Sequence, residues 1–146
     1  MQSERTGTNV KRSLFQVLWR GIVIWLVIMG AETIHGILRS AFLAPMIGDI
    51  RARQFSVLVG SLLILVLTLI FVGWIKASAL HQLIVVGIMW VVLTVGFEIV
   101  LGRFVMGVTW ERIASDYNIA QGGLMIFGLL IMLLAPLMMA KLRGKI

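Results

Sequence analysis

The sequence predicts an all-α integral membrane protein that crosses the bilayer with four transmembrane helices. Of its 146 residues, 60% are hydrophobic and 13% are charged, whereas a soluble domain is typically about 45–50% apolar and about 25% charged. The mean hydropathy is +1.05. Four separate stretches each reach the roughly 20 apolar residues that a membrane helix needs. These observations exclude a soluble domain, a disordered chain and a nucleic-acid-binding protein, despite the net charge of +7.

The predicted spans lie at residues 14–42, 55–75, 80–106 and 122–140. The second and fourth carry no charge, whereas the first and third contain acidic and basic residues in their second halves. We expect Pro45 to end the first helix, because proline disfavours helical backbone at the residue before it, and Pro136 to kink the fourth. We expect the first span to remain in the protein rather than to be cleaved as a signal peptide, because it is long and lacks a small-x-small cleavage site.

The basic residues predict how the chain is oriented. Eight of the thirteen Lys and Arg residues fall on the side of the N-terminus, and the other five lie near acidic residues on the opposite side. The positive-inside rule then places both termini and the turn at residues 76–81 in the cytoplasm. The two longer connections, residues 43–54 and 107–121, face outside. We expect a multi-pass protein of the plasma membrane, in bacteria the inner membrane, whose basic ends contact anionic lipid of the bilayer.

An internal repeat divides the predicted single domain, residues 1–146, into two tandem helical hairpins at about 14–75 and about 80–140. Three short patterns recur in order, at offsets of 66, 67 and 68 residues: Gly30-x-Glu32-x-x-x-Gly36 as Gly96-x-Glu98-x-x-x-Gly102, Asp49-x-x-x-x-Gln54 as Asp116-x-x-x-x-Gln121, and Gly60-x-Leu62 as Gly128-x-Leu130. Two copies with the same orientation predict a pseudo-two-fold axis along the membrane normal. Such an axis brings the first and third spans together, with their glutamates at matching depth.

Ionisable residues within the spans form the candidate site. Glu32, His35 and Arg39 follow i, i+3, i+7 spacing, which places them on one helix face, and the third span carries Glu98 and Arg103. At 1.5 Å per residue from Arg20, Glu32 lies about 18 Å along the helix, in the outer third of the bilayer. A charge in lipid costs about 2.5–3.5 kcal/mol, so such groups face a bundle interior or a wet cavity.

Two interpretations of these charges stay open. The first is a ligand or ion site in which the two glutamates bear charge or exchange protons. The second is structural, with Glu32 paired to Arg103 and Glu98 paired to Arg39 across the pseudo-two-fold. In both interpretations, Gly36 and Gly102 lie one turn beyond the glutamates and let a partner helix approach closely.

A metal centre and a cofactor are not expected. The sequence has no Cys, which removes thiolate ligands and disulfides, and only two His. Glu32-x-x-His35 has the spacing of di-iron carboxylate bundles, but the second copy has Leu101 where the second His is needed. The sequence also lacks a Gly-rich phosphate-binding loop, Gly-x-Ser-x-Gly and His-Glu-x-x-His, and no catalytic residue is assigned.

Polar residues in the two outer connections are the remaining candidates. Their shared feature is a position directly above the glutamates, where they would contact a ligand: Asp49, Arg51, Arg53, Gln54, Glu111, Arg112, Asp116 and Gln121. The acidic and aromatic residues of these connections also have a structural interpretation. Asp49 or Asp116 would cap a following helix, and Trp110 and Tyr117 would be interface anchors.

The predicted function is transport or translocation of a small solute or ion that binds in the outer third of the bilayer. A chain this small would act as a homo-oligomer to enclose a pathway. The first alternative is a non-catalytic accessory or assembly subunit of a larger membrane complex. The second is a membrane enzyme acting on a lipid or polyprenyl phosphate, for which the basic loop residues Arg51, Arg53 and Arg112 are the only support.

Overall fold

The computed structural model describes residues 2–77, 79–121 and 123–144, and the side chains of residues 14–77, 79–120 and 123–144. These residues form helices and short connections. In chain order the elements are α1 (Gln2–Leu38), the π-helical segment η1 (Arg39–Leu43), α2 (Ala44–Ile47), α3 (Asp49–Ile75), α4 (Leu80–Ile99), the π-helical segment η2 (Val100–Val105), α5 (Trp110–Tyr117), the 3-10 turn η3 (Ile119–Gln121) and α6 (Met125–Leu142).

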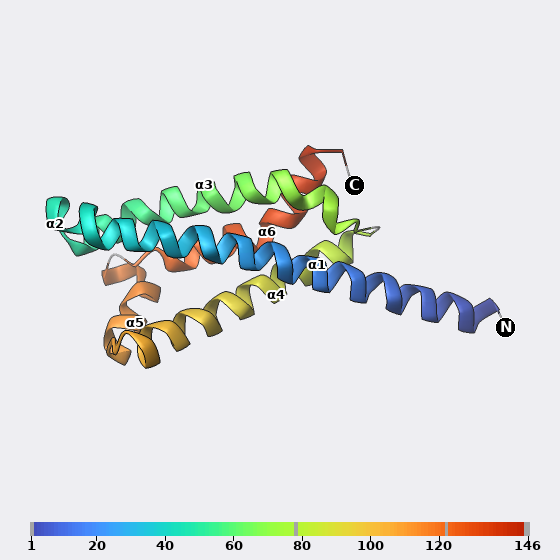
Figure 1. Cartoon of the computed structure of the whole chain (residues 1–146), viewed down its shortest axis with the longest axis horizontal. Coiled ribbons are helices and arrows are strands. Elements are labelled where there is room, and N and C mark those ends of the chain that lie inside the picture. The colour runs from blue at the N-terminus through green and yellow to red at the C-terminus, as the bar shows by residue number, and fades with distance from the viewer. Residues whose placement is uncertain (1, 78, 122, 145–146) are drawn as a thin grey trace.

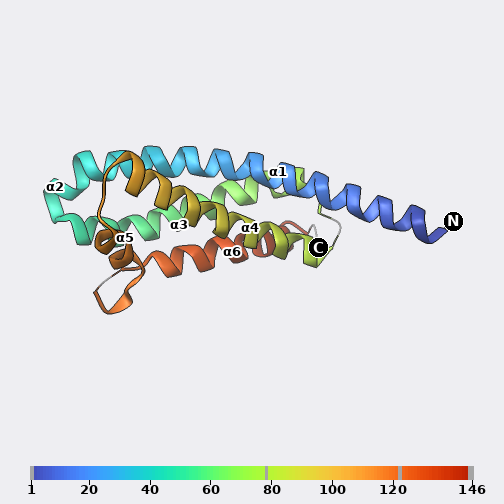
Figure 2. The same ribbon diagram turned by 90° about the horizontal axis from the view of Figure 1, so that it is seen from below.

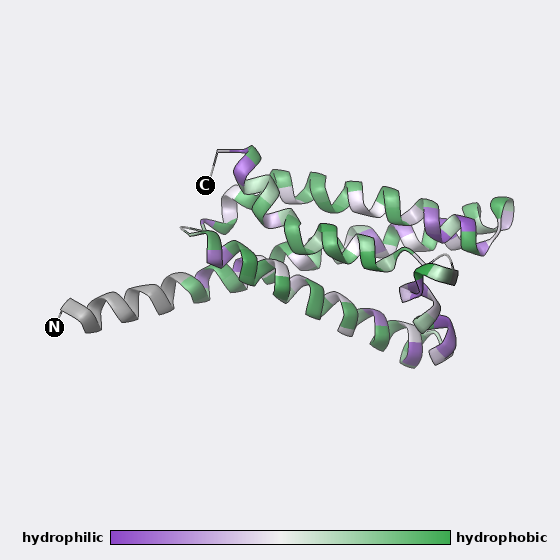
Figure 3. Ribbon diagram, turned by 180° about the vertical axis from the view of Figure 1, so that it is seen from behind, coloured by the Kyte–Doolittle hydropathy of each residue, from purple (hydrophilic) through white to green (hydrophobic). Residues whose placement is uncertain are grey.

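Among the described residues, four helical stretches are long and apolar enough to cross a membrane: Leu14–Ile47, Asp49–Ile75, Leu80–Val105 and Met125–Leu142. The predicted all-α chain with four candidate spans is therefore confirmed, and it is that of a multi-pass membrane protein. Apolar residues cover the middle of these helices, and the polar residues gather toward the two ends of the bundle (Figure 3).

The connection between the first two spans differs from the prediction. Residues 43–54 are helical except for Gly48, which turns the chain between α2 and α3 with φ 91° and ψ 154°, a conformation open to glycine. The third span ends at Val105, close to the predicted boundary, whereas α3 begins six residues before the predicted second span.

Pro45 does not end the first helix, so that prediction is wrong. It lies in the first turn of α2, directly after the π-helical turns of η1. A proline ring normally collides with the carbonyl of the residue four positions earlier. The wider π-helical turn precedes this position and accommodates the ring, and a missing N–H costs little in a first turn. Pro136, by contrast, is buried in the interior of α6.

The four long helices pack as a ring in which each touches two main neighbours. α1 packs against α3 and α4, and α6 packs against the same two helices. Figures 1 and 2 show α2 and α5 at one end of the bundle, and the α3–α4 connection and the end of α6 at the other. Both chain termini lie toward this second end.

Two indole hydrogen bonds fix the register of α1 against α4. Trp25 Nε1 donates to Thr94 Oγ1 at 3.0 Å, and Trp90 Nε1 donates to the carbonyl oxygen of Gly21 at 2.8 Å. The two residues of each pair are 69 positions apart in the sequence. A constant separation means that α1 and α4 run in the same direction, because in antiparallel helices the separation would change from one pair to the next. Such bonds matter in lipid, because the hydrophobic effect does not drive one helix onto another there.

The contact between α4 and α6 is close because of a glycine. A Cβ at Gly87 would lie 2.1 Å from the carbonyl oxygen of Leu133, so no larger residue fits without moving the backbone. Around this contact lies the buried core of the bundle, which includes Ile24, Ile28, Leu83, Val86, Trp90, Met132 and Ala135. This apolar core lies between the two ends of the bundle where polar residues gather.

Candidate functional site

A cavity of about 1020 Å³ occupies the half of the bundle that ends at α2 and α5. All four long helices line it, together with η1 and α5. Figure 1 shows α4 diverging from α1 and α3 toward this end of the bundle. The lining residues that reach furthest along the helices are Met29, Ile64, Thr94 and Met132, which close the inner end. The volume is at the upper end of the range for small-molecule sites, about 300–1,000 Å³.

Glu32 lies in this cavity against the backbone of α3. A Cβ built at Gly60 would be 2.8 Å from Glu32 Oε2, so the carboxylate occupies space that any other residue would fill. The same oxygen lies 3.7 Å from Nδ1 of His35, one turn further along α1. Glu32 Oε1 is buried and has no hydrogen-bond partner among the described residues. The glycine that admits this carboxylate is therefore Gly60 of α3.

Glu98 has a different partner. It accepts a 2.8 Å hydrogen bond from the hydroxyl of Tyr117, at the end of α5. Burial, followed by the charge of Glu98, raises the pKa of Tyr117 well above its usual value of 10.0. The phenol therefore stays protonated at physiological pH and acts as a hydrogen-bond donor. The sequence had suggested an interface anchor at this position.

The two predicted glutamate–arginine pairs are not ion pairs within 4.0 Å in the part of the chain described. Arg103 instead lies over the ring of Trp110, 5.5 Å from its centroid, and its Nη1 is 3.5 Å from the carbonyl oxygen of Val108. Arg39 lies among the cavity-lining residues. It is close enough to act electrostatically on both Glu32 and Glu98. One arginine is thus shared between the two carboxylates.

A network of four charges joins the start of α3 to α5 at the mouth of the cavity. Arg53 pairs with Asp116, and its Nε lies 3.2 Å from Asp49 Oδ2. Arg112 donates from Nη2 to Asp49 Oδ2 at 2.9 Å and from Nη1 to Asp116 Oδ1 at 3.4 Å. Each arginine therefore contacts both aspartates. Alternating charges of this kind stabilise one another more than an isolated exposed pair does.

The capping roles suggested for the two aspartates are not observed. Gly48 is the N-cap of α3, with Asp49 in the first turn, where a negative charge suits the helix dipole. Leu124 is the N-cap of α6. The side-chain cap in this region is Thr109, whose Oγ1 accepts a hydrogen bond from the backbone N–H of Arg112 at the start of α5.

The structure brings together most of the predicted site residues. Those that line the cavity are Glu32, His35, Arg39, Asp49, Arg53, Gln54, Glu98, Arg112 and Asp116. Arg51 and Glu111 are exposed, and Arg103 is directed to Trp110. The side chain of Gln121 lies outside the described residues.

Sequence reasoning missed the small and hydroxyl-bearing residues that line the cavity. Ser56, Gly60 and Ser61 of α3 line the cavity, as does Thr94 of α4. Thr94 accepts from Trp25 and donates to Sδ of Met132 at 3.0 Å, so its hydroxyl is satisfied. The sequence does contain a signal for these residues. Ser56 and Ser61 cluster near the start of the predicted span 55–75, which is otherwise apolar apart from Thr68.

Within the described residues, no group of three or more His, Cys, Asp and Glu side chains is placed to hold a metal ion through those ligands alone. The charges of the cavity nevertheless have a definite balance. In the network at the mouth, two arginines neutralise two aspartates. Deeper in the cavity, two glutamates face one arginine. When both glutamates are ionised, the cavity carries one excess negative charge.

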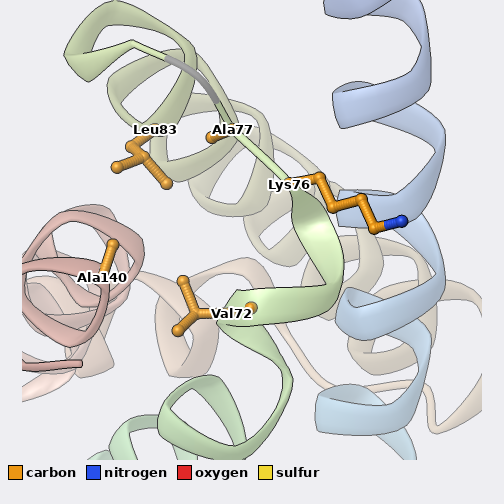
Figure 4. Close-up of a pocket in the computed structure, with 6 residues that line it drawn as sticks. Val72, Lys76, Ala77, Leu83 and Ala140 are labelled. Carbon is orange, nitrogen blue, oxygen red and sulfur yellow. The ribbon is translucent and has the colours of Figure 1, made fainter. Parts of the chain in front are cut away.

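A second, smaller cavity lies at the opposite end of the bundle (Figure 4). Its volume is about 60 Å³, and Val72, Lys76, Ala77, Leu83 and Ala140 are among the residues around it. A space of this size holds a few water molecules at most. In Figure 4 the amine of Lys76 points away from the other labelled residues, so this cavity presents no charged group to a ligand.

No family model, curated protein or solved structure matches this chain. The function is therefore argued from the geometry of the large cavity.

Proposed function

We propose that the protein transports a small solute or ion, which binds in the large cavity in the outer third of the bilayer. The observation that carries this proposal is that one cavity of about 1020 Å³ contains both glutamates of the membrane-spanning helices. Ionisable residues within a membrane are costly, and in transporters they mark substrate or proton pathways. A cavity lined by all four long helices also has the form of a binding site between helices of a bundle.

The charge balance favours a cationic or proton-coupled substrate. When both glutamates are ionised, Arg39 balances one of the two carboxylates, which leaves one negative charge in surroundings that are mostly apolar. A bound cation or a bound proton restores neutrality, so the two exchange with each other at low energetic cost. This supports Glu32 and Glu98 as the charge-bearing groups of the site.

We also propose that the chain consists of two related hairpins in the bacterial inner membrane, with both termini in the cytoplasm. The parallel register of α1 and α4 supports the two related hairpins, as does the packing of α3 against α6. The excess of basic residues on the side of the N-terminus supports the orientation. Both glutamate-bearing helices end in a π-helical segment at the same end of the bundle. Segments of this kind are frequent at functional sites.

Assembly with further subunits is the second part of the proposal. Gly30 and Gly96 are exposed, and a Cβ at either would meet nothing within 4 Å. Glycines on a lipid-facing surface let another helix approach closely. A homo-oligomer would use them to enclose a pathway, and an accessory subunit would use them to bind a larger partner. Purification in mild detergent distinguishes the two by the presence of a stoichiometric second protein.

Flux measurements in proteoliposomes test the transport proposal. We expect the purified protein to dissipate an imposed gradient of protons or small cations, and the double variant Glu32→Gln with Glu98→Gln to lose this flux. Glu111→Gln is the matched control, because Glu111 is an exposed glutamate of α5 outside the cavity lining. Flux that is unchanged in the double variant, or absent from the wild-type protein, would contradict the proposal.

A further inference from the structure

The wall of the large cavity suits an organic molecule better than a bare ion. The cavity volume of about 1020 Å³ is far larger than an ion with a few waters needs, since one water occupies about 30 Å³. Methionine side chains are flexible and polarisable, so they adapt to apolar ligands of different shape. Apolar side chains of all four long helices and of η2 contribute to the wall: Met29, Ile64, Phe97, Leu101, Leu129 and Met132.

Glu32 is the carboxylate in this cavity that has bonding capacity left for a ligand. Glu98 accepts the hydrogen bond of Tyr117 at 2.8 Å. Glu32 Oε1 has no hydrogen-bond partner among the described residues, and Nδ1 of His35 lies 3.7 Å from Oε2, too far for a hydrogen bond. The Glu32 side chain is nevertheless 23% exposed and lines the cavity. A ligand in the cavity can therefore reach it and supply a donor.

The charge balance calls for one positive charge on that ligand. Arg39 acts electrostatically on both Glu32 and Glu98, so the deep part of the cavity has one excess negative charge when both are ionised. A carboxylate in apolar surroundings needs hydrogen-bond donors as well as a counter-charge. An ammonium group provides both, because its N–H groups form charge-assisted hydrogen bonds to a carboxylate.

We propose that the cavity binds a small organic amine in its protonated form, with the ammonium group donating to the carboxylate of Glu32 and the apolar body lying against the methionine- and leucine-containing wall. This inference rests on the proposed transport function and names the substrate class of the same cavity. Gly60 holds the acceptor in place, since a Cβ there would lie 2.8 Å from Glu32 Oε2.

A set of ligands that share one apolar body and differ in their polar group is the direct test. Adamantylamine, adamantanol and adamantane carboxylate form this set, and methylamine supplies the charge without the body. Equilibrium dialysis of each ligand against the full-length protein in neutral detergent, with protein-free micelles as the blank, measures binding at neutral pH. We expect the wild-type protein to bind adamantylamine about 10-fold or more tighter than adamantanol and methylamine, and not to bind the carboxylate.

Glu32→Gln tests the role assigned to the carboxylate. This variant should bind adamantylamine and adamantanol with similar affinity, because the charge that distinguishes them is gone. Glu111→Gln is the matched control and should keep the wild-type preference, since Glu111 is exposed and lies outside the cavity lining. Thermal unfolding in detergent establishes that each variant is folded.

The ligand series on the wild-type protein decides the inference even if Glu32→Gln does not fold. Equal affinity for the amine and the alcohol overturns it, and so does methylamine binding as tight as adamantylamine. A preference for the amine that persists in folded Glu32→Gln also overturns it. Glutamate-dependent flux of protons or inorganic cations without amine binding contradicts this inference alone. Amine binding without flux of any substrate contradicts transport and leaves the binding site in place.

Discussion

The hydroxyl of Tyr117 donates a 2.8 Å hydrogen bond to Oε2 of Glu98. Glu98 lies within the third membrane-spanning stretch, whereas Tyr117 ends α5, which lies between the third and fourth. The bond therefore connects a carboxylate inside the bundle to the short helix at the mouth of the cavity. A change in the charge of Glu98 changes the strength of this bond, because a hydrogen bond to an ionised acceptor is about twice as strong as a neutral one.

The first prediction concerns the titration of Tyr117. Burial and the nearby charge of Glu98 raise its pKa above the usual 10.0, and the chain has one tyrosine. The ultraviolet absorbance of tyrosinate should thus appear only well above pH 10.0 in the folded protein and near that value after denaturation. The folded state holds this proton more tightly, so the contribution to stability is complete below the unfolded pKa and is lost as the pH rises above it. Tyr117→Phe provides the spectroscopic blank, and a folded-state midpoint at the ordinary value would contradict the prediction.

The second prediction compares two glycines of α4. Gly87→Ala should destabilise the protein by about 2–3 kcal/mol, because the new Cβ would lie 2.1 Å from the Leu133 carbonyl oxygen and would force α4 and α6 apart. In the monomer, Gly96→Ala should be neutral or stabilising by up to about 1 kcal/mol, since no atom of the same chain lies within 4 Å and alanine favours helix. Thermal unfolding in detergent measures both, and equal effects would show that the helices do not meet closely at Gly87.

The third prediction concerns the charge network at the mouth of the cavity. Asp116→Asn removes the charge that Arg53 and Arg112 share, so α5 should open more often. Amide hydrogen exchange in α5 should rise about 10-fold, which corresponds to about 1.4 kcal/mol. High salt should raise exchange in the wild-type protein in the same direction, because these side chains are partly exposed. Glu111→Gln in the same helix should leave the exchange unchanged, and a similar rise in that variant would argue against the network.

The fourth prediction tests the orientation of the chain. The protein has no cysteine, so single cysteines can be introduced as reporters. Glu111→Cys in α5 and Lys141→Cys near the end of α6 lie at opposite ends of the bundle. In intact spheroplasts, a membrane-impermeant maleimide should label Glu111→Cys directly and Lys141→Cys only after permeabilisation. The reverse pattern would place both termini outside.

The sequence was a good guide to the spans because their signal is local. The length of an apolar stretch is enough to predict a membrane helix. The predicted end of the third span, Met106, lies one residue from its observed end, Val105. The prediction was wrong around Pro45 for a physical reason. A proline is read as a helix end, whereas the π-helical turns of η1 carry the helix past it to Gly48. Widened turns of this kind have no simple sequence signature.

Residue type in the sequence was enough to single out the two glutamates of the candidate site, but it did not predict which residues contact them. Glu32 and Glu98 stand out in apolar helices, and the cavity contains both. Their nearest contacts come from elements far away in the sequence. Gly60 admits Glu32, and Tyr117 holds Glu98, whereas the spacing had suggested arginine partners across the repeat. Helix spacing reports which residues share a face, and it does not report what a neighbouring helix presents to that face.

The sequence by itself determined the solvent in which this chain folds, the number of long apolar helices and which of those helices carry glutamates. Each of these follows from composition and from residues close together in the chain. Only the tertiary structure decided that Arg39 acts on two carboxylates and that Arg53 and Arg112 are held by the aspartates. It also decided that Ser56 and Ser61 line the same cavity as Glu32. The reason is physical. The energy of a charge or hydroxyl in lipid depends on the groups that packing brings within a few ångströms, and that packing joins residues from separate helices.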